Sequence, residues 1–208
     1  MKQYEFIFCT KGFLDPDTLP RAKNPDKGFF ATANQNLNPY GSADPITICM
    51  GTYRADRIDS LLEGKTGLTR EDMYAIHLDL YSTQAERFME IIRPLLPDTA
   101  RGRILRDWDL CYREASKGAS LFEAVYRQLY GRVFGDNGFG RAAVDFLAGE
   151  TGIFIDFYDN FDCILLSETS PWFNGRTREE IFREALDRAL DADPMPWGQD
   201  RPVFFSHI

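Results

Sequence analysis

Apolar residues recur at a helical period over most of this chain, and that recurrence limits how it can fold. From residue 69 onward they follow a 3.6-residue period that ends before Pro94, as expected of one amphipathic helix. Thr177 and Glu180 form a capping box ahead of a second apolar stripe. The same period predicts further helices over residues 54–63, 120–130 and 140–147. A mainly helical block is therefore predicted for residues 54–195.

The first quarter of the chain has a different pattern. Short aromatic or apolar runs alternate with loops rich in proline and asparagine, which predicts strands over residues 4–8, 28–33 and 46–50. Residues 153–158 fit either a strand or a helical turn. We therefore expect an α+β chain in three parts: a strand and loop segment over 1–53, the helical block over 54–195, and a returning tail over 196–208.

Composition excludes several classes of partner. The net charge is -8 and the isoelectric point is near 4.9, whereas phosphate binding requires a basic face, so nucleic acid is not an expected partner. No apolar run approaches the ~20 residues that span a bilayer, so no membrane partner is expected either. The four cysteines form no CxxC pair, which argues against structural zinc and leaves the redox compartment open.

Other motifs are better explained structurally. His77 falls inside a predicted helix and is interpreted as a surface or packing residue rather than a member of a triad. The glycine-rich stretch 135–140 lacks the Lys-Ser/Thr of a phosphate loop and is interpreted as a turn between helices. Three aspartates at every third position lack the glycine and closing glutamate of a calcium loop and are interpreted as surface acids: Asp156, Asp159 and Asp162.

One stretch is more specific. Residues 24–35 read NPDKGFFATANQ, which resembles the NPxxGFIATANN motif of the penicillin amidase family of N-terminal-nucleophile acylases. Three further segments, 19–21, 53–62 and 68–79, resemble that family's LPR, YRAxRIxxLL and LTxEDMxAIQxD motifs in the same order. The Trp-Gly near residue 197 resembles its C-terminal WG motif, although the first histidine is missing, and Gln35 replaces the second asparagine of NN.

The resemblance implies a fold and site residues. Its fold would be α+β, with the strands of residues 1–53 joining an αββα sandwich. Asn34 matches the family's oxyanion-hole asparagine, and Arg54 matches the arginine that orients it; both are expected catalytic-site residues. Asp44 matches an aspartate that binds a structural calcium in some members, and no other cofactor is implied. On their own residues, Asn34 would be a strand-end turn residue and Arg54 a surface charge.

The resemblance also implies what the chain lacks. These enzymes attack with an N-terminal residue, usually serine, whose own amine acts as the base. Met1 cannot serve, and Cys9 and Ser42 are internal. We therefore expect a fragment of an acylase that cleaves linear amides, inactive alone, whose partners are the nucleophile-bearing segment, the small chain and the amide substrate. The alternative is a non-catalytic subunit or a stand-alone interaction domain. The family is mostly exported, but no signal peptide is recognisable here.

Overall fold

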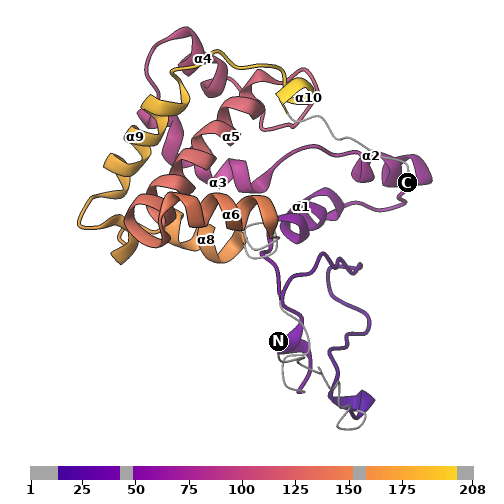
Figure 1. Ribbon diagram of the computed structural model, residues 1–208. Coiled ribbons are helices and arrows are strands. Elements are labelled where there is room, and N and C mark those ends of the chain that lie inside the picture. The colour runs from indigo at the N-terminus through magenta and orange to yellow at the C-terminus, as the bar shows by residue number, and fades with distance from the viewer. Residues whose placement is uncertain (1–13, 43–48, 152–157, 201–208) are drawn as a thin grey trace, which may run out of the picture.

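The computed structural model describes residues 14–42, 49–151 and 158–200, and within these ranges regular structure is almost entirely helical (Figure 1). An irregular arm, residues 14–42, precedes a block of packed helices. The helices are α1 Tyr53–Leu62, α2 Arg70–His77, α3 Thr83–Ile92, α4 Ala100–Arg106, α5 Lys117–Tyr130, α6 Arg141–Glu150, α8 Tyr158–Leu166, α9 Arg178–Ala189 and α10 Trp197–Asp200. Short 3-10 turns are η1 Pro16–Thr18, η2 Asn38–Tyr40, η3 Arg93–Leu95 and η5 Pro171–Phe173, and Gly131–Phe139 is a π-helical continuation of α5.

The expected α+β sandwich is wrong for the described chain. No strand or sheet occurs in the three described ranges, where the one β feature is an isolated bridge between Tyr81 and Cys111. The predicted strand over 28–33 consists of bends and irregular backbone. The runs over 4–8 and 153–157, and most of 46–50, lie outside the described residues. The glycine-rich stretch 135–140, expected to be a turn, instead lies mostly within the π-helical segment.

The arm closes on itself by local turns, which explains why no strand forms there. A strand requires a neighbour that takes up its backbone hydrogen bonds. The described arm instead pairs its two ends, with Ser42 N donating to Thr18 O at 2.9 Å and Arg21 N to Tyr40 O at 3.2 Å. Gly41 permits this approach, since a Cβ there would lie 2.6 Å from the Thr18 carbonyl oxygen. Short apolar runs alone therefore overestimated the strand content of the described arm.

Polar caps set where the helices begin. Thr177 caps α9 through a complete capping box with Glu180, as the sequence predicts, and Thr69 caps α2 in the same way with Asp72. Further side-chain caps come from three residues at the starts of α3, α4 and α5: Ser82, Thr99 and Ser116. Each cap satisfies a backbone N–H that has no partner within its helix.

The single helix expected between residues 69 and 94 is two helices. Residues 78–82 leave the helical path and lie beside residues 110–112, where Ser82 N donates to Leu110 O at 2.9 Å and Tyr112 N to Leu80 O at 3.0 Å. Ser82 then caps α3. The apolar period continues across the break, so the period alone could not reveal it.

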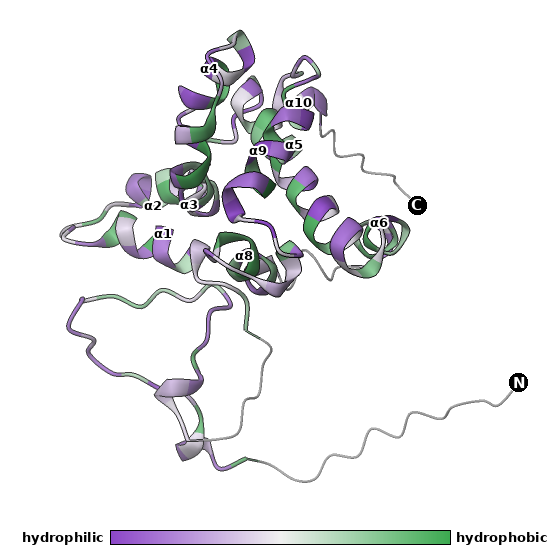
Figure 2. Ribbon diagram, turned by 90° about the vertical axis from the view of Figure 1, so that its left-hand side faces the viewer, coloured by the Kyte–Doolittle hydropathy of each residue, from purple (hydrophilic) through white to green (hydrophobic). Residues whose placement is uncertain are grey.

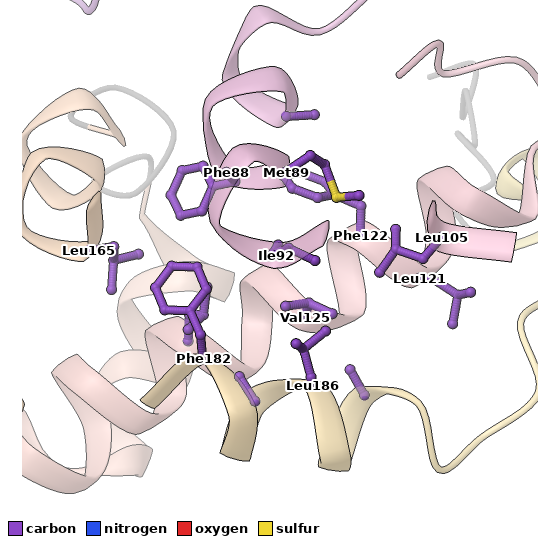
Figure 3. Packing of buried hydrophobic residues seen from close by; sticks show 14 of the residues in the cluster. Phe88, Met89, Ile92, Leu105, Leu121, Phe122, Val125, Leu165, Phe182 and Leu186 are labelled. Atoms are coloured by element: carbon purple, nitrogen blue, oxygen red, sulfur yellow. The ribbon is translucent and has the colours of Figure 1, made fainter. Parts of the chain in front are cut away.

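Aromatic and aliphatic side chains of α3, α5 and α9 form the core (Figure 3). Phe88 of α3 is fully buried, lies edge-on to Phe122 of α5 at 6.2 Å between ring centroids, and stacks on Phe182 of α9 at 6.3 Å. Leu165 brings helix α8 onto this core (Figure 3), and the apolar residues of α8 can be followed in Figure 2. Removing a core phenyl ring typically costs about 3–5 kcal/mol, so these contacts hold the helical block together.

Helix α2 differs from its neighbours because it has no buried residue. Several large apolar side chains in and around it are exposed: Leu68, Met73, Tyr74, Leu78 and Leu80. Leu78 is the extreme case, with 76% of its surface exposed. Across the described ranges, no helix has the length and apolar character needed to cross a membrane.

Candidate functional site

Asn34 lies where the arm returns to the helical block. Its φ of 65° is in the left-handed region, which asparagine tolerates better than most residues. The Asn34 carbonyl accepts a hydrogen bond of 2.8 Å from Met50 N. This bond sets Asn34 beside the segment that leads into α1, so the arm is held near the first turn of that helix.

Arg54, in the first turn of α1, binds the side chain of Asn34. Arg54 Nη2 donates to Asn34 Oδ1 at 2.6 Å and to the Ala33 carbonyl at 3.0 Å. Because a guanidinium only donates, the hydrogen-bond pattern assigns the amide oxygen to Arg54 and turns Nδ2 away from it. Within the described ranges, no acceptor is found for Nδ2. Asn34 and Arg54, 20 positions apart, are thus joined, and the Asn34 Nδ2 group remains available as a hydrogen-bond donor.

Gln35, which departs from the family motif, closes the adjacent backbone. Its Oε1 accepts from Ala33 N at 2.6 Å, and its Nε2 donates to the Ala31 carbonyl at 2.9 Å. A side chain that bonds both ways fixes the turn from residue 31 to residue 35. Gln35 therefore has a structural role in the backbone next to Asn34.

A groove of about 630 Å³ begins at Arg54 and runs between α1 and α3. Its rim carries a two-bonded ion pair in which Arg57 Nε and Nη2 lie 2.7 and 2.9 Å from the Asp79 carboxylate. This pair lowers the pKa of the Asp79 carboxyl. Aromatic and aliphatic side chains form much of the wall: Tyr53, Tyr81, Tyr112, Tyr126, Tyr158, Ile58, Leu61, Ile76 and Leu80.

Behind the groove wall lies a buried carboxylate that the sequence did not single out as functional. Asp162 has no exposed surface, so its interpretation as a surface acid is wrong. Its Oδ1 accepts from the Tyr126 hydroxyl at 2.6 Å, and its Oδ2 accepts from Gln84 Nε2 at 2.6 Å. Burial raises the pKa of Asp162 to about 6, although hydrogen bonds from Tyr126, Gln84 and Tyr53 act in the opposite direction.

The predicted metal ligand cannot be placed, since Asp44 lies outside the described residues. Asp159 and Asp162 are described and Asp156 is not; no group of three potential ligands gathers anywhere in the described part of the chain. His77 is the last residue of α2 and is exposed.

Comparison with protein families matches the sequence to the penicillin amidase family over residues 2–203. The match spans nearly the whole sequence and includes both Asn34 and Arg54. The chain therefore belongs to the penicillin amidase family, which places it among acylase-type amidohydrolases. Compared with individually curated proteins, the sequence has no significant match.

Proposed function

We propose that this chain supplies the oxyanion donor of an acylase that hydrolyses linear amides. The observation that carries the proposal is the 2.6 Å hydrogen bond from Arg54 Nη2 to Asn34 Oδ1. In this proposal Asn34 Nδ2 donates to the carbonyl oxygen of the substrate, and Arg54 holds the amide in the required orientation. Penicillin-type and acyl-homoserine-lactone-type amides are the substrate classes proposed.

The chemistry requires such an arrangement. Attack on an amide carbonyl places negative charge on its oxygen, and donors must already lie about 3 Å from that position. If the amide rotated freely, the free-energy cost of ordering it would reduce the stabilisation that it gives to the transition state. An amide held by a guanidinium is already oriented, and the nearby positive charge also favours the developing oxyanion.

Both side chains are exposed, which supports a further polypeptide surface at this site. Electrostatic stabilisation is much stronger when water is excluded. We therefore propose that a nucleophile-bearing segment and the small chain of the acylase cover Asn34 and Arg54 in the active enzyme. An internal serine, threonine or cysteine has no adjacent free amine of the kind this chemistry uses, so we propose that the nucleophile comes from that other segment and that this chain alone is inactive.

A second candidate function is that of a non-catalytic subunit or interaction domain derived from the acylase. The exposed apolar side chains around α2 favour it, since a helix without buried residues presents its apolar positions to another surface. The two proposals differ in what they predict for Asn34: the first requires it for turnover, and the second does not.

The test is an assay of phenylacetyl and long-acyl chromogenic amides with the purified chain and with the chain co-expressed with the products of neighbouring genes. We expect no turnover above a heat-treated control for the chain alone and turnover for the combination. Turnover by the chain alone that disappears when an internal serine or cysteine is replaced would refute the proposal that another segment supplies the nucleophile.

A further inference from the structure

The first turn of α8 lies against the candidate site although it is more than 100 residues away in sequence. The Tyr158 ring stacks on Tyr53 at 5.6 Å between centroids and 19° between planes. The Tyr158 hydroxyl lies 3.4 Å from the Gly51 carbonyl oxygen and also interacts with Arg54. The first turn of α8 therefore contacts Gly51, Tyr53 and Arg54.

Gly51 shows how closely α8 approaches. A Cβ atom at residue 51 would lie 2.5 Å from Asp159 Oδ1, so only glycine fits between the two segments. The neighbouring Met50 N donates to the Asn34 carbonyl at 2.8 Å. The backbone that carries Asn34 is thus packed, through residues 50 and 51, on the start of α8.

Asp162 lies one turn further along α8, on the same side as Tyr158. Its carboxylate is bonded by Tyr126 of α5 and Gln84 of α3, and the Tyr53 hydroxyl of α1 interacts with it as well. Asp162 therefore connects α1, α3 and α5. Tyr53 immediately precedes Arg54. Asp162 therefore contacts the direct neighbour of Arg54, and Arg54 bonds Asn34.

We infer that Asp162 is a positioning residue for the Asn34–Arg54 pair, acting through Tyr53 at the first turn of α1. The inference rests on the proposed function only in assigning a use to that pair; the coupling itself is a property of this chain. Asp162 touches neither substrate nor reacting atoms. Asp162 interacts with the hydroxyl end of Tyr53 and Tyr158 stacks on its ring, and together they position the first turn of α1 from which Arg54 bonds Asn34 Oδ1.

The surroundings of Asp162 make the coupling sensitive to its charge. The groups that face it are Tyr53 of α1, Gln84 of α3, Tyr126 and Tyr130 of α5, and Asp159 of α8. All the groups that bond it are donors, and donors bind a carboxylate more strongly than a neutral acid. Protonation of Asp162 near pH 6 should therefore loosen Tyr53, and with it Arg54 and the Asn34 amide.

The test follows the side-chain amide resonances of Asn34 in the ¹⁵N-labelled 208-residue chain by NMR, assigned by their loss in Asn34→Asp. We expect these resonances to shift with a midpoint near pH 6, and the titration to be lost in Asp162→Asn. Tyr53→Phe keeps the stacked ring and removes only the hydroxyl; we expect it to shift the Asn34 signals and weaken their titration.

Tyr112→Phe is the matched control. It also removes a partly buried tyrosine hydroxyl bonded to a carboxylate, but that carboxylate is Glu123, at 2.7 Å, and not Asp162. We expect it to leave the Asn34 titration intact. Equal effects of the two tyrosine variants, or a titration that persists in Asp162→Asn, would overturn the inference. Because the readout needs no turnover, its failure is distinct from failure of the proposed function.

Discussion

Asp162 is a carboxylate without exposed surface, and at the scale of single residues it makes the sharpest prediction about stability. Its pKa is about 6 in the folded chain against an ordinary 3.8, so between these values the folded state keeps a proton that the unfolded state has lost. Its contribution to stability therefore falls as pH rises through this window. The difference corresponds to on the order of 3 kcal/mol, from about 1.4 kcal/mol per pKa unit.

The measurement is the free energy of unfolding of wild type and Asp162→Asn by denaturant at pH 4 and pH 7. We expect wild type to lose stability relative to the variant as pH rises. Asp79→Asn is the control of opposite sign, because the Arg57 ion pair lowers the pKa of Asp79, and its contribution is lost as pH falls. A wild-type to Asp162→Asn difference that does not change with pH would contradict the burial of a charged group at this position.

The sequence pointed to the Asn34–Arg54 pair, which the structure brings together, but it did not point to the buried carboxylate of Asp162. Motif spacing singled out Asn34 and Arg54 and led us to expect their side chains in one place; the structure joins them at 2.6 Å, while their catalytic role stays a prediction. Asp162 was missed because a carboxylate in a run of aspartates has no local sign of burial. Its burial arises from Gln84 and Tyr126, which are 78 and 36 positions away.

At the scale of elements, two helices with the same cap make a matched pair. Thr177→Ala removes the capping box of α9, whose apolar face is in the core, so we expect it to lower the global free energy of unfolding by about 1 kcal/mol. Thr69→Ala removes the same motif from α2, which buries nothing, and we expect it to increase hydrogen exchange within α2 while changing global stability much less. Equal losses of global stability would show that α2 folds cooperatively with the core.

Helix starts were more predictable than strands, for a physical reason. A cap such as Thr177 acts on a backbone N–H three residues away, so the information is local. A strand depends on a partner elsewhere in the chain, and the run 28–33 found none in the described part of the structure. The helix α4 was missed because its seven residues include three arginines and show little apolar period.

At the scale of the whole molecule, the exposed apolar cluster around α2 predicts association. We expect the isolated chain to bind a hydrophobic dye or self-associate, and Leu78→Glu to reduce either effect. Met195→Glu is the control, since Met195 is also exposed, at 52%, but lies at the other end of the chain near α10. Dye fluorescence and light scattering measure both outcomes. A monomeric chain that binds no dye would count against a partner surface at α2.

The central claim is the proposal that Asn34 donates to the developing oxyanion, and its most direct test is the kcat of an enzyme assembled from this chain and the nucleophile-bearing partner proposed for it. Asn34→Ala should lower kcat by roughly 10²–10³-fold, the usual cost of losing one oxyanion donor. Asn36→Ala, two residues away, removes the local hydrogen bond that Asn38 N donates to Asn36 Oδ1 and should leave kcat within about twofold, because surface changes of this kind typically have small effects. Equal kcat values for the Asn34 and Asn36 variants in an active assembly would contradict the account.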